Sequence, residues 1–291
     1  GSARLNVFRR GGDSLLGRYI YYRLHPFTLA ERLGHVSNQK VGEELSLPSE
    51  VSSNARSVLS QLEKFGGFPE PFFRQDDIFL RQWQNARAER IVRDDIRDLE
   101  QVRDLSALHE LALALPAKVG SLFSLNALRE DFSVTHKTMA HWVEILEQLY
   151  YHYRIYPYAS SPLVSRRREP KMYLWDWSVV ESSSARFENL IASHLLKFVH
   201  YLYDVFGFRA ELYFMRDARG NEVDFLVTVN HAPWFAVEVK EQDEKIAKTL
   251  NLFKEKYNIP YSYQIVRTPN IYQREKGVVL VSADLFLSGL V

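Results

Sequence analysis

The chain has 291 residues, enough for two or three domains, and its 46% hydrophobic and 25% charged residues are typical of a globular protein. A formal net charge of +1 argues against a basic surface over the whole chain, and the lack of cysteine excludes disulfides and thiolate metal sites. No apolar run approaches the roughly 20 residues that a membrane-spanning helix needs. We therefore expect a cytoplasmic protein with no membrane contact.

The first 33 residues are rich in arginine and contain two local patterns. Residues 19–24 predict a short strand, which ends at His25-Pro26 because proline removes a backbone donor. Thr28 and Glu31 follow with the spacing of a capping box, in which an acid stands three residues after the capping hydroxyl. We therefore expect a strand and then the start of a helix.

Residues 49–104 have a helical pattern with one break. Val58, Leu62 and Phe65 fall on one face of a first helix, and the glycines and prolines of residues 66–71 end it. A second helix is predicted over 75–103, where Arg and Asp recur three and four residues apart. Such spacing is typical of a solvated helix face with ion pairs.

Residues 105–175 predict three helices and a hairpin. The second and third helices are separated by a tight turn at 133–135, which is the helix-turn-helix pattern. An aromatic strand over 150–158, a polar tip over 160–170 and a return strand over 171–175 complete a winged helix.

The basic residues of this module suggest one of two roles. The predicted tip carries Arg166, Arg167 and Arg168, and the exposed side of the third helix includes Lys137 between His136 and His141. Arg166, Arg167, Arg168 and Lys137 would contact DNA phosphates if the module binds nucleic acid. The alternative is contact with a protein partner or a joint between domains, because the fold alone does not decide function.

The last third of the chain has the order of a restriction-endonuclease-like core. It predicts a helix over 185–206 and a second helix over 244–257. Strands are expected before and after the second helix, in the order αβββαβ with one extra strand. The five expected strands are 211–215, 223–229, 234–239, 262–266 and 278–281.

Two neighbouring strands of this core carry residues that suit phosphodiester hydrolysis. Asp224 lies near the head of one strand, and Glu238 and Lys240 lie on the same face of the next. Asp224 and Glu238 would be ligands of Mg²⁺ or Mn²⁺, which prefer oxygen donors. Lys240 would be the catalytic lysine that stabilises charge in the transition state.

Two further acids could belong to the same site. Glu188 on the preceding helix is a candidate third metal ligand or an acid just outside the ligand set. Glu222 shares a face with Asp224 but lies nearer the strand entrance, so we rank it second. The competing interpretation of Glu238 and Lys240 is an amphipathic strand with a surface ion pair.

Short sequence patterns spread over nearly the whole chain point to one family. They are Gly1-Ser2-Ala3, Ser14-Leu15-Leu16-Gly17-Arg18, Leu24-His25-Pro26-Phe27 with Glu31, Gly66-Gly67-Phe68-Pro69, Lys171-Met172-Tyr173-Leu174-Trp175-Asp176, Phe187-Glu188-Asn189 and the acids and lysine above. With these patterns the chain resembles the bacterial and archaeal AAA-type ATPases that carry a C-terminal winged helix and a PD-(D/E)XK nuclease-like domain.

The resemblance implies four parts. They are an ATPase-core remnant over 1–33, a helical ATPase lid over 34–104, a winged helix over 105–180 and a PD-(D/E)XK nuclease-like domain over 181–291, in an α/β multidomain chain. It also implies that Arg18 is a candidate arginine finger. The Walker A pattern occurs nowhere in the chain, so ATP binding and a homo-oligomer formed through the ATPase part are expected of the full-length protein only.

One position departs from the family pattern. After Asp176 the family has a small Thr-Gly pair, and this chain has Trp177-Ser178, which leaves the local turn geometry open. Function is then expected to be Mg²⁺- or Mn²⁺-dependent DNA cleavage in an ATP-driven assembly. The alternative is a catalytically silent nuclease fold that binds nucleic acid or a protein partner in a nucleotide-driven switch.

Overall fold

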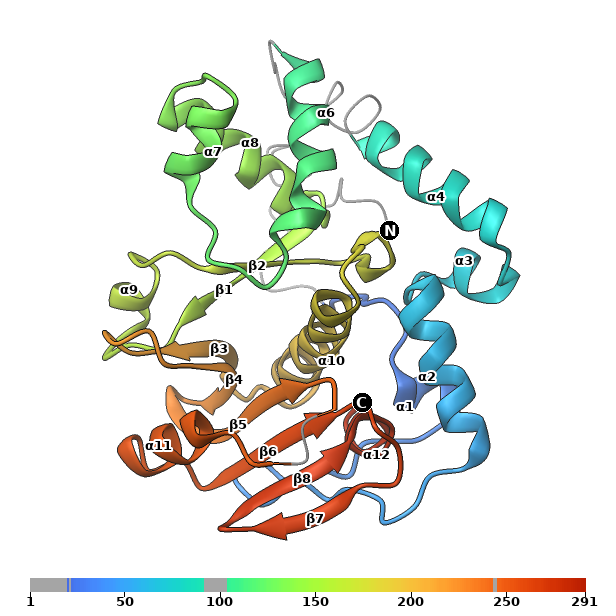
Figure 1. Cartoon of the computed structure of the whole chain (residues 1–291), viewed down its shortest axis with the longest axis vertical. Helices are drawn as coiled ribbons and strands as arrows, with labels where there is room; N and C mark the ends of the chain where they lie inside the picture. Colours follow the sequence, from blue (N-terminus) through green and yellow to red (C-terminus); the bar gives the residue numbers. More distant parts are fainter. Residues whose placement is uncertain (1–19, 21, 92–103, 243–244) are drawn as a thin grey trace.

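The computed structural model describes residues 20, 22–91, 104–242 and 245–291. Over these residues the chain is a mixed α/β structure with eleven α-helices and one eight-stranded sheet. The helices that precede the hairpin lie above and beside the sheet, and the long helix α10 (Ser183–Phe206) runs across its centre (Figure 1). None of the described helices is long and apolar enough to cross a bilayer.

The N-terminal part of the described chain is helical. Thr28 forms the expected capping box with Glu31, but residues 20 and 22–27 form no strand. Arg23 instead forms an ion pair with Asp204 of α10 at 2.6 Å, so this segment is fixed by side-chain contacts rather than by a sheet. The helices here are α1 (Leu29–Leu33), α2 (Ser53–Phe65), α3 (Pro69–Arg74) and α4 (Asp77–Arg90).

The middle of the chain contains the expected helices and hairpin. Thr135 accepts a hydrogen bond from the backbone N–H of Thr138 and so begins α8, which follows α7 after a tight turn. The hairpin tip is not only a polar loop, because it contains a short helix, α9. The elements are α6 (Leu105–Ala114), η3 (Leu115–Lys118), α7 (Leu125–Asp131), α8 (His136–Gln148), β1 (His152–Pro157), α9 (Pro162–Ser165) and β2 (Lys171–Leu174), then η4 (Trp177–Val179).

The C-terminal third supplies the remaining strands. The helix expected over 244–257 begins only at Lys248, because Gln264 of β6 accepts from the backbone N–H of Ala247 and donates to the carbonyl of Lys245. The edge strand β7 was not expected, since its four residues are exposed and polar. The elements are β3 (Ala210–Arg216), β4 (Glu222–Val229), β5 (Ala232–Lys240), α11 (Lys248–Lys256), β6 (Tyr261–Val266), β7 (Tyr272–Glu275), β8 (Val278–Ser282) and α12 (Ala283–Ser288).

One sheet joins the hairpin to the C-terminal strands. The strand order is β2-β1-β3-β4-β5-β6-β8-β7. β1 pairs with β3 in parallel through Tyr156↔Tyr213 and Pro157↔Phe214. The sheet therefore crosses residue 180, where the sequence predicts a domain boundary.

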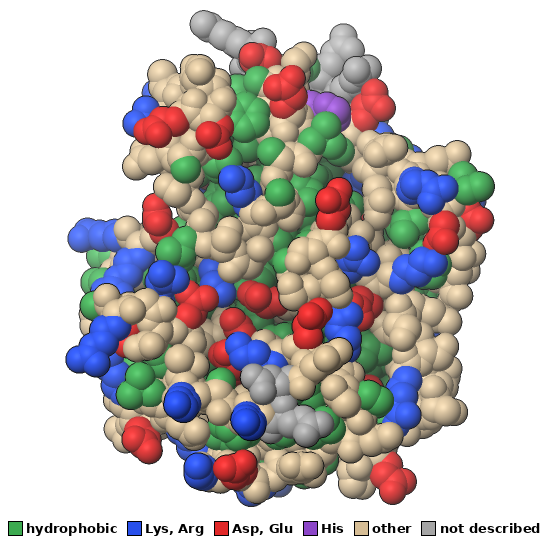
Figure 2. Space-filling model, in the orientation of Figure 1, with side chains coloured by type: hydrophobic (Ala, Val, Ile, Leu, Met, Phe, Trp, Pro, Cys, Tyr) green, Lys and Arg blue, Asp and Glu red, His purple; other side chains and the backbone are tan. Residues whose placement is uncertain are grey.

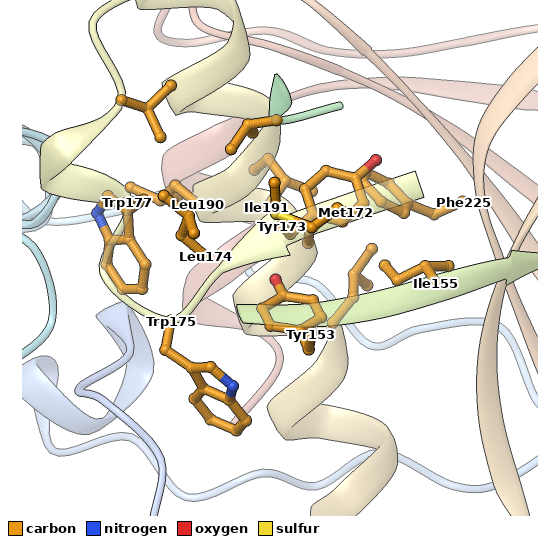
Figure 3. Packing of buried hydrophobic residues seen from close by; sticks show 14 of the residues in the cluster. Tyr153, Ile155, Met172, Tyr173, Leu174, Trp175, Trp177, Leu190, Ile191 and Phe225 are labelled. Carbon is orange, nitrogen blue, oxygen red and sulfur yellow. The ribbon is translucent and has the colours of Figure 1, made fainter. Parts of the chain in front are cut away.

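Aromatic residues fill the space between the hairpin and α10 (Figure 3). Tyr153 and Tyr173 stack with ring centroids 5.8 Å apart, and Tyr173 lies 5.8 Å from Phe225 of β4. Tyr173 and Phe225 are fully buried. Burying each such side chain contributes about 1.5–3 kcal/mol, so this layer holds the hairpin firmly against the C-terminal strands.

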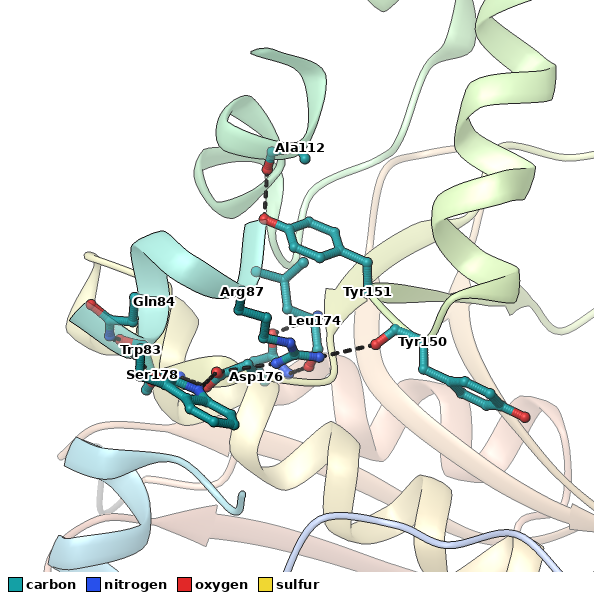
Figure 4. Close-up of polar contacts among 10 residues, drawn as sticks. Trp83, Gln84, Arg87, Ala112, Tyr150, Tyr151, Leu174, Asp176 and Ser178 are labelled. Atoms are coloured by element: carbon teal, nitrogen blue, oxygen red, sulfur yellow. Dashed lines mark hydrogen bonds and ion pairs between the residues drawn. The ribbon is translucent and has the colours of Figure 1, made fainter. Parts of the chain in front are cut away.

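A buried carboxylate connects α4 to the segment after the hairpin (Figure 4). Asp176 accepts hydrogen bonds from Ser178 Oγ at 2.6 Å and Trp83 Nε1 at 3.2 Å, and it pairs with Arg87 at 3.1 Å. It also caps η4, in which Trp177 is buried and donates to the carbonyl of Leu62 at 2.6 Å. The Trp177-Ser178 departure therefore has a structural role, since it joins α2 and α4 to the hairpin.

Candidate active site

The sheet brings Asp224 and Glu238 together. β4 and β5 are antiparallel with Phe225 opposite Val237, so one further step along the register places Asp224 opposite Glu238. The backbone N–H of Val239 donates to Asp224 Oδ2 at 2.8 Å, which fixes that carboxylate at the end of β5. The structure thus brings both predicted metal ligands to the same end of the two strands.

Glu238 has one oxygen in an ion pair and one that accepts from no donor in the described part of the chain. Its side chain is 6% exposed, and Oε1 lies 2.6 Å from Lys240 Nζ. Oε2 is buried and accepts no hydrogen bond from any described residue. Leaving a buried carboxylate oxygen unsatisfied costs more than 1 kcal/mol, so this atom marks a place where a cation or donor would be stabilised.

Glu188, on α10, lies next to this pair but is already bonded. Tyr173 Oη donates to Glu188 Oε1 at 2.7 Å, and Lys171 Nζ lies 3.5 Å from the same oxygen. Gly120 packs directly on the carboxylate, because a Cβ at that position would lie 3.1 Å from Glu188 Oε1. Glu188 as a metal ligand stays a prediction, since its bonded oxygen faces Tyr173 and Lys171.

Glu222 is held by two cations. Lys171 Nζ lies 2.5 Å from Glu222 Oε1, and Arg216 Nη1 lies 2.9 Å from Oε2. With both oxygens paired, Glu222 is less available than Asp224 or Glu238. The second rank of Glu222 as a candidate ligand stays a prediction.

Lys171 is the central residue that sequence reasoning did not assign to the site. Its side chain is 5% exposed and reaches Glu222, Glu188 and, at 3.7 Å, Asp224. The available signal was the alternation of Lys171 and Tyr173, which places both on one face of β2. Their meeting with Glu188 and β4 depends on β1 pairing with β3, which no local pattern indicates.

The buried acids hold protons more strongly than free ones. Burial and the charge of Asp224 raise the pKa of Glu188 to about 7, and the same two causes raise the pKa of Glu238 to about 7. Burial also raises the pKa of Asp224. Burial alone would lower the pKa of Lys171, but the charges of Glu188, Asp224 and Glu222 outweigh it and raise that pKa above its usual value. Lys171 therefore stays charged at neutral pH.

The donor set suits a hard divalent cation held by two carboxylates. Within residues 20, 22–91, 104–242 and 245–291, no group of three or more Asp, Glu or His residues is arranged to hold a metal. Mg²⁺ is commonly bound by only one or two carboxylates together with substrate phosphate and water. Asp224 and the unpaired Oε2 of Glu238 fit that simpler mode.

The predicted nucleic-acid contacts form a separate basic region. Arg166, Arg167 and Arg168 follow α9 at the hairpin tip and line a cavity of about 310 Å³, and Lys137 is exposed on the first turn of α8. Basic side chains gather over the hairpin tip and the neighbouring strands in Figure 2, while acidic side chains appear nearer the centre of that face. The arginine-finger candidate Arg18 lies outside the described residues.

The fold and the site define a mixed α/β protein with a carboxylate–lysine cluster where β4 begins and β5 ends. Residues 56–189 match a family model described as "Domain of unknown function (DUF8612)", and residues 184–286 match one described as "Domain of unknown function (DUF4143)". No curated protein matches the chain. No solved structure matches it either. The two family matches meet at the start of α10, which contributes Glu188 to the cluster.

Proposed function

We propose that the chain carries a Mg²⁺- or Mn²⁺-dependent DNA nuclease of the PD-(D/E)XK type, formed by α10 and the strands that follow. The observation that carries this proposal is the position of Asp224 opposite Glu238 and beside Lys240, with Glu238 Oε2 buried and without a donor among the described residues. The order of helices and strands from α10 onward supports a restriction-endonuclease-like core. The α7–α8 pair and the β1–β2 hairpin support a winged helix that contacts DNA.

Each residue has a distinct task in this proposal. Asp224 and Glu238 would hold the cation, which when bound lowers the pKa of water and offsets charge on the phosphate. The backbone N–H of Val239 orients Asp224, and the cation would replace the missing donor at Glu238 Oε2. Lys240 would place a positive charge beside the attacking oxygen or the transition state.

A cleavage assay tests the proposal. Supercoiled and single-stranded DNA are incubated with Mg²⁺ or Mn²⁺ and the wild-type chain, Asp224→Asn or Lys240→Met. We expect each substitution to slow cleavage by about 100-fold or more, because each removes a group that acts on the reacting phosphate. Glu255→Gln, an exposed acid on α11, is the matched control and should cleave like wild type. Equal rates in all four proteins would exclude this catalytic assignment.

A second candidate function is a catalytically silent nuclease fold that binds nucleic acid or a partner protein. Lys171 favours it, because this buried ammonium group already neutralises part of the carboxylate cluster. Binding of Mn²⁺, followed by calorimetry, separates the two functions. If the nuclease fold is silent, wild type should show no saturable Mn²⁺ binding at this site. If the fold is a nuclease, wild type should bind Mn²⁺ and Asp224→Asn should remove that binding.

We also infer that ATP acts only through the full-length protein, whose ATPase part would form a homo-oligomer. The support is the sequence resemblance together with the C-terminal family match, since that domain is commonly associated with AAA-ATPase-linked proteins. The test is ATP hydrolysis by this chain alone, which we expect to be undetectable. Hydrolysis by the isolated chain would overturn the inference.

A further inference from the structure

The cavity at the hairpin tip is built as a binding pocket. It lies between the starts of α7 and α8 and the connection from β1 to β2, and its volume of about 310 Å³ is at the lower end of the roughly 300–1,000 Å³ typical of ligand sites. Its walls are tied to the rest of the chain. Ser165 Oγ donates to the carbonyl of Pro157 at 2.6 Å, and the backbone N–H of Phe123 donates to the carbonyl of Pro170 at 2.7 Å.

One side of the pocket offers a flat surface. Tyr156 and Arg154 both line it, and the Arg154 guanidinium lies 5.9 Å from the centre of the Tyr156 ring. Arg154 is held by Glu147, whose Oε2 accepts from Arg154 Nε at 3.0 Å. Because Glu147 balances its charge and fixes its plane, Arg154 is preorganised for stacking rather than for binding a phosphate.

The rim supplies the unpaired positive charge. Arg166, Arg167 and Arg168 line the same cavity, and their side chains form no ion pair with another described residue. Glu169 also lines the pocket and offsets part of this charge. The pocket thus combines an aromatic and guanidinium surface with a basic rim, which is how proteins hold unpaired bases and their phosphates.

We propose that this pocket receives one unpaired nucleotide of a DNA strand. Its base would lie against Tyr156 and Arg154, and its flanking phosphates would contact Arg166, Arg167 and Arg168. The inference rests on the proposed function in that the hairpin module is taken as the DNA contact. The pocket is large enough for a single nucleotide and too small to enclose a duplex, so the substrate class becomes DNA with a single-stranded segment.

The pocket is adjacent to the carboxylate cluster along the chain. Pro170 lines the pocket, and Lys171, the next residue, contacts Glu222 and Glu188. The pairing of Ile155 with Lys171 places Lys171 on the opposite hairpin face from Arg154 and Tyr156. A DNA strand that reaches both the pocket and the carboxylate cluster would therefore pass around the hairpin tip, where the three arginines lie.

Fluorescence anisotropy tests the pocket. A labelled single strand of 20 nucleotides and a blunt duplex are titrated in EDTA, so that no cleavage occurs. We expect wild type to bind the single strand more tightly than the duplex. Tyr156→Leu should weaken single-strand binding by about 5- to 150-fold, which is the loss expected for one stacked base. Duplex binding by this variant should be unchanged. Tyr156→Phe should retain the affinity, and Tyr272→Leu, on the far edge strand, is the matched control.

A second readout does not depend on the affinity of a variant. A single strand that contains 2-aminopurine should lose fluorescence on binding wild type, because stacking quenches this base, and the quenching should be absent with Tyr156→Leu. Replacing Arg166, Arg167 and Arg168 together by Ala should weaken the binding of both DNA forms and make the affinity less dependent on salt concentration. If only the arginine variant loses affinity and no quenching occurs, the proposal of a nucleotide pocket is wrong, while the proposed DNA contact of the hairpin stands. If wild type binds neither DNA form, both fail.

Discussion

At the residue scale, the main feature is a cluster of four carboxylates and two lysines, in which burial raises the pKa of Glu188, Asp224 and Glu238. The acids are Glu188, Glu222, Asp224 and Glu238. Of the two lysines, Lys171 is buried and Lys240 is partly exposed. Buried acids with raised pKa values are common at functional sites, because function requires charges that folding alone would avoid. The raised pKa values of these acids are therefore consistent with the proposed metal site.

Lys171 is expected to be indispensable for folding stability. Lys171→Met would leave three partly buried carboxylates without their shared cation, and breaking such a buried group typically costs about 3–5 kcal/mol. Urea denaturation at pH 7 measures this loss. Lys118→Met, at an exposed position in η3, is the control and should change the free energy of unfolding by less than about 0.5 kcal/mol. A small loss at Lys171 would show that water already screens the cluster.

The raised pKa of Glu238 predicts how stability depends on pH. The folded chain binds this proton more tightly than the unfolded chain, so the free energy of unfolding falls as pH rises from about 4.5 to about 7 and then levels off. Glu238→Gln should raise stability at pH 8 by on the order of 1–3 kcal/mol and weaken the pH dependence. Thermal unfolding at several pH values measures this. Stability that rises through this window for wild type would contradict the direction of the shift.

At the element scale, the segment after β2 joins the N-terminal helices to the hairpin. Asp176 connects η4 with α4, and Trp177 fills the space beside α2. A Cβ at Gly67 would lie 2.6 Å from the Trp177 ring, so the glycine leaves the room that the large side chain needs. The large Trp177 side chain is thus accommodated by packing elsewhere in the chain.

Asp176→Ala should destabilise the chain by about 3–5 kcal/mol, because it leaves the largely buried Arg87 guanidinium without its carboxylate partner and removes the cap of η4. Asp77→Ala breaks the exposed pair with Lys64 and should cost less than about 1 kcal/mol. Chemical denaturation of both variants measures the difference. Similar losses for the two would mean that the buried network contributes no more than a surface pair.

At the scale of the whole molecule, one sheet unites segments that the sequence assigns to different domains. Lys171 and Tyr173 come from the hairpin, whereas Glu188, Asp224 and Glu238 come from the C-terminal part. The cluster is complete only when β1 pairs with β3. A C-terminal domain separated at residue 180 would therefore lack part of its own site.

A fragment of residues 181–291 should be less stable than the same region in the whole chain. It would lose the cation that neutralises Glu188 and Glu222, and it would expose the β3 edge and the buried face under Tyr173. Hydrogen exchange of the β3 and β4 amides in fragment and whole chain measures this. Equal protection in both would show that the hairpin adds nothing to the C-terminal fold.

Local patterns in the sequence were enough to locate most elements and to place Asp224, Glu238 and Lys240 on their strands. Alternation and caps depend on neighbours a few residues apart, so they can be recognised without the fold. The strand expected over 19–24 was wrong for its described residues, 20 and 22–24, because side-chain contacts with α10 hold this segment in place of backbone pairing. The late start of α11 and the edge strand β7 were missed, because Gln264 and the β8 edge act from distant positions.

The sequence by itself determined which residues can do chemistry, since residue type and strand period are local properties. Only the tertiary structure decided that Lys171 and Tyr173 join Glu188 and β4, and that Arg154 and Tyr156 share a pocket with the three arginines at the hairpin tip. These contacts depend on the parallel pairing of β1 with β3 and on the packing of α7 and α8 against the hairpin. Both bring together residues far apart in the chain, and no local pattern records which distant partner a strand or helix will choose.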